Sequence, residues 1–130
     1  MTFGLTRLTF EMGPPTREAF GDSLASAGSD ERVVVLDGDV SNSTYTNAFA
    51  AKYPDRFFNV GIAESNLIGI ASGLAASGKV PVAASFSTFL LSNAFDQIRM
   101  SVAFPNMNVK LVGSHAGISI GEDGPSQMAI

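Results

Sequence analysis

The chain has 130 residues, of which 45% are hydrophobic and 15% charged, a balance typical of one globular domain with a substantial core and not of a disordered chain. Its formal net charge is −4, from 8 basic and 12 acidic residues that form no basic run, so the charge pattern argues against nucleic-acid binding. The absence of cysteine excludes disulfides and thiolate metal sites, and the absence of a long apolar run or a leader pattern leads us to expect a soluble, cytoplasmic protein without a membrane partner.

Helices and strands are predicted to alternate along most of the chain. Residues 1–13 carry no clear pattern and are expected to form an N-terminal arm, followed by a single domain over residues 14–130. Helical spacing predicts helices at 17–27 (with Thr16 as cap), 46–52, 64–77 and 88–104, and apolar runs predict strands at 33–36, 56–60, 79–86 and 108–113. A further helix is expected to begin near Pro125, so we expect the domain to be incomplete at its C-terminus.

Short connections between alternating strands and helices are typical of an α/β fold with a doubly wound, mostly parallel sheet flanked by helices. Ligands of such sheets bind at the carboxyl ends of the strands, and polar side chains follow every predicted strand. They are Asp37, Asp39, Ser41 and Ser43 after the first, Glu64 after the second, Ser85, Ser87 and Thr88 after the third, and His115, Glu122 and Asp123 after the fourth. One edge of the sheet should therefore collect the carboxylates, the hydroxyls and the single histidine.

Glu64 is the most informative single residue, because it stands where an apolar strand leads through a glycine into a helix. An acidic side chain at this position favours a helix N-terminus through the helix dipole. A carboxyl group at the carboxyl edge of the sheet can equally share a proton with a heterocycle bound in a cleft. Its position alone leaves both interpretations open.

Three segments in order resemble the transketolase family. They are RFFNVGIAESN at 56–66, STFL at 87–90 with DQIR at 96–99, and VGSHAG at 112–117 with GEDGPS at 121–126. The resemblance covers roughly residues 14–130 and is closest to two-gene transketolases, in which one chain binds the diphosphate and the second begins with the pyrimidine-binding domain. It implies the thiamine-diphosphate-binding fold of the pyrimidine type.

The resemblance implies a catalytic and cofactor-binding role for Glu64. Thiamine diphosphate performs the carbon–carbon chemistry, and the family's glutamate hydrogen-bonds a pyrimidine ring nitrogen and so promotes the tautomer that removes the C2 proton. A glutamate in that role must be protonated or share its proton, a state that burial against apolar side chains favours. We expect Val60, Ile62 and Leu67 to form the apolar wall.

The resemblance also implies further cofactor contacts. Phe89 and Phe95 match aromatic residues that pack against the pyrimidine, whereas a third aromatic of the family corresponds to Ser92 here. Asp39 matches an acidic residue near the thiazolium side of the cofactor. Phe95 lies on an apolar helical stripe and Asp39 follows a glycine, so ordinary core packing and turn formation remain alternatives.

Five residues are implied in substrate binding. His115, also a catalytic candidate, and Asp123 match residues that hold the sugars through their hydroxyls, while Arg17 and Ser43 match phosphate-binding positions. The alternative for Arg17 and Ser43 is ordinary solvated surface. Gln127 stands where the family usually has histidine, and because glutamine can hydrogen-bond but cannot titrate, proton transfer should be slower or the substrate different.

The expected activity is transfer of a two-carbon ketol unit between sugar phosphates, by a transketolase-like transferase of carbohydrate metabolism. The cofactor would be thiamine diphosphate with Mg²⁺ or Ca²⁺ held by a partner domain, because the acidic run at 37–39 continues unlike the family's metal motif. The chain should therefore be active only with a diphosphate-binding subunit, within a dimer or larger homo-oligomer. Gly69 and Gly73 either pack against the sheet or open a groove for a partner.

Several alternatives remain at this point. The chain can be a non-catalytic dimerisation or partner-binding module derived from such a domain, or belong to a deoxyxylulose-phosphate synthase or a 2-oxo acid dehydrogenase β-type subunit. The spacing from His115 to Asp123 favours transketolase over the two neighbouring enzymes. A flavodoxin-like domain is disfavoured, because the loop after the first strand is too acidic to cradle phosphate.

Overall fold

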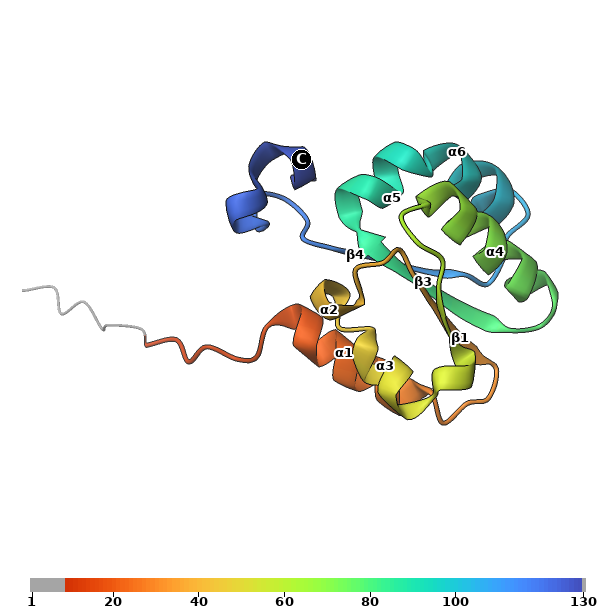
Figure 1. The fold of residues 1–130 in the computed structure, drawn as a ribbon, viewed down its shortest axis with the longest axis horizontal. Coiled ribbons are helices and arrows are strands. Elements are labelled where there is room, and N and C mark those ends of the chain that lie inside the picture. The colour runs from red at the N-terminus through yellow and green to blue at the C-terminus, as the bar shows by residue number, and fades with distance from the viewer. Residues whose placement is uncertain (1–8, 130) are drawn as a thin grey trace, which may run out of the picture.

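The computed structural model describes residues 9–129, which form a four-stranded sheet between two layers of helices (Figure 1). The strands are β1 (Val33–Asp37), β2 (Phe57–Asn59), β3 (Val80–Phe86) and β4 (Lys110–Ser114). Their order is β2-β1-β3-β4 and every neighbouring pair is parallel, with Val35 opposite both Phe57 and Val82. The prediction of a doubly wound parallel sheet is confirmed, and its four carboxyl ends lie along one edge.

Helices cover both faces of the sheet (Figure 1). On one face, α1 (Thr16–Ala27) and α3 (Asn47–Lys52) bury Leu24 and Phe49 against Val33 and Val35 of β1. On the other face, α4 (Glu64–Ala76) and α5 (Ser87–Asn93) pack against Leu36 and β3. All five residues of β1 are therefore buried, which explains why its sequence is an unbroken apolar run that ends in an acid.

The predicted single helix at 88–104 is wrong at Ala94. α5 ends at Asn93, Ala94 leaves the helical conformation with φ −126° and ψ 13°, and the chain continues as α6 (Phe95–Gln97) and the π-helical segment η2 (Ile98–Ala103). Leu90 and Ala94 are buried whereas Leu91 and Phe95 are exposed. The break and the wider turn of η2 change which side chains face the sheet, so the stripe read at constant helical spacing is not one buried face.

The predicted helix near Pro125 is also wrong. Residues Gly121–Gln127 form a 3₁₀ segment (η3) that is interrupted at Gly124, whose φ of 64° and ψ of −150° belong to no helix. Met128 is extended and Ala129 forms an antiparallel bridge with Gly117. The last described residues thus close a loop beyond the end of β4 and do not start a new helical layer.

The structure describes part of the expected N-terminal arm. Residues 9–15 are exposed and contain neither helix nor strand, whereas residues 1–8 of the predicted arm lie outside the described residues. α1 begins at Thr16 after Pro15, without a side-chain cap, so the predicted capping role of Thr16 is wrong. Among residues 9–129, the helices are too short or too polar to cross a bilayer.

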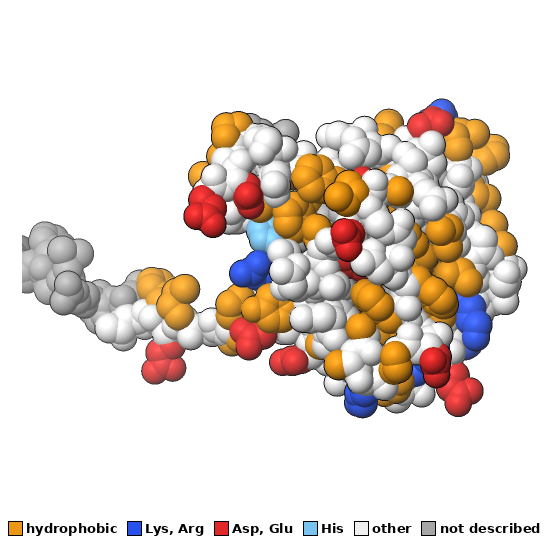
Figure 2. All heavy atoms as spheres, viewed as in Figure 1, with side chains coloured by type: hydrophobic (Ala, Val, Ile, Leu, Met, Phe, Trp, Pro, Cys, Tyr) orange, Lys and Arg blue, Asp and Glu red, His pale blue; other side chains and the backbone are white. Residues whose placement is uncertain are grey.

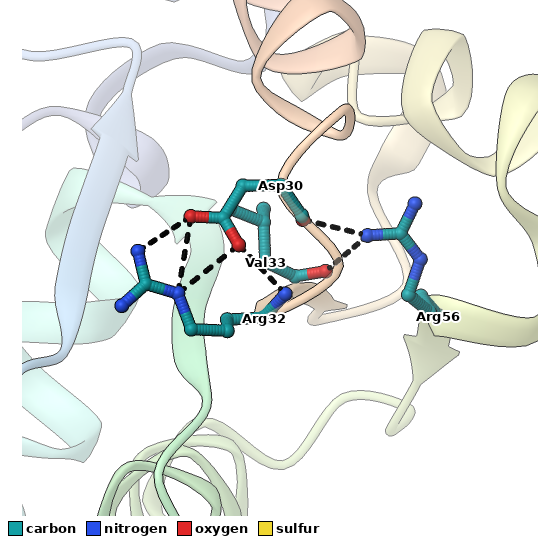
Figure 3. Close-up of polar contacts among 4 residues, drawn as sticks. All are labelled: Asp30, Arg32, Val33 and Arg56. Atoms are coloured by element: carbon teal, nitrogen blue, oxygen red, sulfur yellow. Dashed lines mark hydrogen bonds and ion pairs between the residues drawn. The ribbon is translucent and has the colours of Figure 1, made fainter.

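Arg56 donates hydrogen bonds to the chain before and at the start of β1, at the amino end of the sheet (Figure 3). Its guanidinium donates to the carbonyl oxygens of Gly28, Asp30 and Val33 at 2.6, 2.9 and 3.0 Å. Beside it, the hydrogen bonds from Arg32 lower the pKa of Asp30 to about 2. The arginine that opens the RFFN motif is therefore a structural residue, which holds the loop before β1 in place.

Candidate functional site

The loop that precedes Glu64 is tied to the loop that follows β1. Gly61, with φ 76°, turns the chain between β2 and α4. The Asn59 side chain accepts the Gly61 N–H at 2.9 Å and donates to Asp39 Oδ1 at 2.7 Å. Asp39 itself has φ 68° and lies exposed in a tight turn. These contacts bring Asp39 and the start of α4 to the same edge of the sheet.

Glu64 is buried at that edge, with 3% of its surface exposed. Ser85 Oγ donates to its Oε1 at 3.2 Å and Asn93 Nδ2 donates to its Oε2 at 3.4 Å. Asn93 is anchored in turn, because its carbonyl oxygen accepts a hydrogen bond from Ser65 Oγ. Neither ion pair found within residues 9–129 involves Glu64, so neutral donors alone hold this carboxyl group.

The surroundings of Glu64 match the expected apolar wall only in part. Leu67 is fully buried and Val60 packs against the same core cluster. Ile62, by contrast, is 82% exposed, because it lies in the turn after Gly61 and faces solvent. Gly38 supplies the remaining wall as bare backbone, since a Cβ there would lie 3.0 Å from Ser85 Oγ and 3.6 Å from Glu64 Oε1.

The two candidate aromatic residues lie in different environments. Phe89 is partly buried and stacks on Phe86, with ring centroids 5.5 Å apart and an interplanar angle of 16°. Phe86 also contacts the His115 ring at 4.5 Å. Phe95 is 62% exposed and makes no ring–ring contact within residues 9–129, which contradicts its interpretation as ordinary core. Ser92 is exposed.

Four of the predicted substrate residues line one cleft of about 780 Å³, between α1, α2 (Ser41–Thr44), the end of β4 and η3. They are Arg17, Ser43, His115 and Asp123. Arg17 Nη1 donates to the Ser43 carbonyl oxygen at 3.4 Å and lies 3.2 Å from His115 Nε2. Figure 2 shows the hollow beneath the C-terminal segment, with the histidine and a basic side chain at its base.

Gln127 does not line this cleft. Its side-chain oxygen Oε1 is buried and has no hydrogen-bond partner among the described residues. A buried carbonyl oxygen without a donor carries a desolvation cost of about 1–3 kcal/mol. The structure therefore separates Gln127 from the other four substrate candidates and leaves its buried acceptor unsatisfied among the described residues.

His115 has a strained backbone and a constrained ring. Its φ is 56°, in the left-handed region, and Ser114 Oγ lies 2.9 Å from Nδ1. Partial burial of the ring lowers the pKa of His115 below 6.5, the Arg17 charge lowers it further, and Asp123 opposes both. Burial and the Arg17 charge therefore favour the neutral form of the imidazole over the charged form.

Asp37 organises the loop that carries Ser43. The carboxylate is fully buried and accepts hydrogen bonds from Val40 N at 2.6 Å and from the hydroxyls of Thr44 and Thr46, each at 2.8 Å. Because its bonds are satisfied within the loop, Asp37 is a structural residue. Within residues 9–129, His, Asp and Glu nowhere gather in a group of three that could hold a metal ion.

Sequence reasoning missed the residues that position the candidate groups. The sequence predicts Ser85 only as a residue at the edge of the sheet, although a hydroxyl at the end of an apolar strand is a detectable signal. Phe86 and Ser114 lie next to motif residues, and adjacency alone does not show their contacts. Asn93 gave no signal, because its bond to Glu64 joins residues 29 positions apart in sequence.

Comparisons with known proteins identify the family of the chain. Residues 12–130 match the family described as "Transketolase, pyrimidine binding domain". The chain is 51% identical over 111 residues to a "Putative transketolase C-terminal section" of Methanocaldococcus jannaschii, covering 85% of this chain and 35% of the relative. It is 49% identical over 117 residues to human transketolase, covering 88% of this chain and 18% of the relative.

A solved structure titled "Split gene transketolase, inactive beta4 tetramer" superimposes with a TM-score of 0.74 at 48% identity. The match covers 82% of this chain and 36% of that one, so the chain spans about a third of the length of this structure's chain and of the Methanocaldococcus jannaschii relative. The family match covers nearly the whole chain, and the parallel sheet carries a buried glutamate at its carboxyl edge. The chain therefore belongs to the transketolase family, as a pyrimidine-binding domain.

Proposed function

We propose that this chain supplies the pyrimidine-binding half of a thiamine diphosphate active site in a split-gene transketolase. The observation that carries the proposal is the burial of Glu64 at the carboxyl edge of the sheet, where two neutral donors hold it. A buried carboxyl group without a cationic partner is suited to share a proton with a ring nitrogen. The complete enzyme would transfer a two-carbon ketol unit between sugar phosphates.

The described residues fit the cofactor's pyrimidine. Bound thiamine diphosphate supplies the carbanion and electron sink for the carbon–carbon step. Glu64 would hold the ring nitrogen, and its Oε2 is the oxygen more easily freed, because the bond from Asn93 is the longer at 3.4 Å. Phe89 and Phe95 would pack against the ring and Asp39 would face the thiazolium side. The diphosphate, with Mg²⁺ or Ca²⁺, would be held by a partner.

The cleft fits a phosphorylated sugar. Arg17 and Ser43 would bind the phosphate, because the guanidinium and the loop of α2 meet at one end of the cleft. His115 and Asp123 would hold sugar hydroxyls, and His115, 3.2 Å from Arg17, would also meet the phosphate. Gln127 lies outside the lining of the cleft, and without a titrating group it cannot shuttle a proton as the family's histidine would.

An active site of which this chain supplies only the pyrimidine-binding half requires a partner subunit. Gly69 and Gly73 face open space on α4, since a Cβ at either would meet no atom within 4 Å, so the interpretation that they pack against the sheet is wrong. Exposed large apolar side chains lie on the same and neighbouring elements: Phe58, Ile62, Ile70, Leu91 and Phe95. Surfaces of this kind favour subunit contacts, here with a diphosphate-binding chain and further copies, in the cytoplasm.

A second candidate function is a non-catalytic dimerisation or partner-binding module. The exposed apolar side chains favour it, because they need no catalysis to explain them. The related solved structure is described as an inactive "beta4 tetramer", which shows that a relative can assemble without activity. Activity in the presence of a diphosphate-binding partner would separate the two candidates, and a ketose-phosphate donor assay would separate transketolase from the synthase and dehydrogenase alternatives.

The test is a Glu64→Gln variant assayed for ketol transfer with the diphosphate-binding partner, alongside calorimetric binding of thiamine diphosphate with Mg²⁺. We expect turnover to fall about 10²–10⁴-fold, the usual contribution of an acid–base group, with the fold retained. Glu31→Gln, which removes the same charge from an exposed loop at the amino end of the sheet, should leave turnover unchanged. Glu64→Gln turnover above about a tenth of wild type would refute the role, because a loss of less than about tenfold is smaller than an acid–base group contributes.

A further inference from the structure

The two nitrogens of the His115 ring have partners that determine where its proton lies. Arg17 Nη1 lies 3.2 Å from Nε2 and Ser114 Oγ lies 2.9 Å from Nδ1. A guanidinium only donates hydrogen bonds and stays charged, so Nε2 must be the acceptor. The neutral ring then carries its proton on Nδ1 and donates it to Ser114 Oγ.

Protonation of His115 is incompatible with this contact. An imidazolium has a hydrogen on both nitrogens, so Nε2–H and the Arg17 N–H would point at each other. The charged groups that line the cleft around the ring are Arg17 on α1 and Glu122 and Asp123 on η3. α2 contributes only neutral side chains, and the end of β3 contributes the Phe86 ring. Arg17 is the only cation among these.

An anion between Arg17 and His115 reverses the preference. The oxygens of a phosphate-type dianion accept hydrogen bonds from both groups, and charge-assisted bonds of this kind are about twice as strong as neutral ones. The most favourable arrangement has Arg17 and Nε2–H both donating to the anion. Reaching it requires one proton from solvent on Nε2 and loss of the Arg17–His115 contact.

We propose that binding of a phosphate-type dianion in this cleft protonates His115, which changes Nε2 from acceptor to donor, and that Ser114 is the positioning residue that orients the ring for both states. The identity of the dianion as the phosphoryl group of a sugar rests on the proposed function. The coupling itself rests only on the contacts of Arg17, His115 and Ser114.

The coupling gives anion affinity a definite pH dependence. The bound dianion raises the pKa of His115 above its value in the ligand-free cleft, so affinity is highest below the free-state pKa. Affinity then falls as pH rises toward the bound-state pKa, and is constant above it. Each unit by which the anion raises the pKa corresponds to a tenfold difference in affinity between the imidazolium and the neutral form.

The chain has a single histidine, which makes NMR of histidine labelled with ¹³C and ¹⁵N a direct test. The full chain would be titrated from pH 5 to 9 with and without sulfate, whose charge does not change in that range. If partner chains add signals, His115→Gln identifies the one to follow. We expect the Nδ1–H tautomer in the free protein and a rise of about one pKa unit with saturating sulfate, which would weaken binding about tenfold across the titration.

Four variants separate the coupling from a general charge effect. Arg17→Gln should raise the free-state pKa of His115 and weaken sulfate binding at least tenfold. Arg32→Gln, a matched change at the amino end of the sheet, should alter neither. Ser114→Ala should lower the fraction of the Nδ1–H tautomer, and Ser114→Thr should restore it, because it keeps the hydroxyl.

Four results would overturn the inference. These are a dominant Nε2–H tautomer in the free protein, no sulfate binding at millimolar concentration, sulfate binding that leaves the pKa of His115 unchanged, and an equal response of Arg32→Gln. Thiamine diphosphate binding measured in parallel distinguishes the two proposals. Loss of cofactor binding with intact anion coupling would refute only the proposed function, and the reverse would refute only the coupling.

Discussion

The buried carboxyl group of Asp37 should be one of the main supports of the cleft lined by Arg17 and His115, and Thr46→Val tests that role. Thr46 is fully buried, and its hydroxyl donates to Asp37 Oδ2 at 2.8 Å and lies 3.1 Å from Thr44 Oγ1. Valine has nearly the shape of threonine but no hydroxyl. The substitution therefore removes one donor from a buried charge with little change of packing.

The expected cost follows from the contacts that remain. A hydrogen bond to a charged group contributes about 1.5–3 kcal/mol to stability. After Thr46→Val, Asp37 still accepts hydrogen bonds from Val40 N and Thr44 Oγ1. The carboxyl group therefore keeps two of its three donors. We expect a loss of about 2 kcal/mol in the free energy of unfolding. Asp37→Ala should cost more, because it also leaves the Val40 N–H without its acceptor.

Urea unfolding followed by circular dichroism measures this loss, as a lower midpoint at unchanged slope. Thr9→Val, in the exposed segment before α1, is the matched control and should stay within about 0.5 kcal/mol of wild type. Thr46→Val should also weaken sulfate binding, because the same loop carries Ser43. A Thr46→Val loss no larger than that of Thr9→Val would show that Asp37 does not support the loop as described.

Three further predictions concern the same framework. Gly21→Ala should push α1 away from Tyr45 and weaken sulfate binding measured by calorimetry, because its Cβ would lie 2.7 Å from the Tyr45 carbonyl oxygen and 2.8 Å from Tyr45 Cβ; unchanged affinity would contradict the close approach. Phe49→Ala should lower the free energy of unfolding by about 3–5 kcal/mol, since the ring is fully buried beneath Tyr53 and Arg56; a loss under 1 kcal/mol in urea would contradict this packing. Because the pKa of His115 is lowered below 6.5, the unfolded chain binds the proton more tightly, so stability should fall as pH drops from about 6.5 toward the folded-state pKa. His115→Gln should flatten that part of the stability–pH curve, and an identical curve would refute the shift.

The sheet could be predicted from local sequence because its strands are buried on both faces. An unbroken apolar run such as Val33–Leu36 has no other favourable environment in a small domain. The prediction of a single helix at 88–104 is wrong because the local sequence does not reveal the break. Its apolar residues continue at helical spacing through Ala94, and only the packed structure shows that the chain leaves the helix there. A π-helical turn changes the periodicity without changing the composition.

The edge that holds the site could also be predicted, but not the contacts within it. The rule that ligands bind at the carboxyl ends of parallel strands places Glu64 and His115 on one edge without any distance. The 3.2 Å approach of Arg17 to His115 joins residues 98 positions apart, and it depends on how α1 packs beside β4. No local pattern contains that information, just as none contains the bond from Asn93 to Glu64.

Phe86 connects the two parts of the proposed site. It is the last residue of β3, one position after Ser85, which donates to Glu64. Its ring stacks on Phe89 and contacts His115, so the proposed aromatic side of the cofactor pocket and the histidine of the proposed substrate cleft share one wall. The proposed anion site and the proposed pyrimidine surface therefore meet at the Phe86 ring, although Phe89 lies on α5 and His115 follows β4.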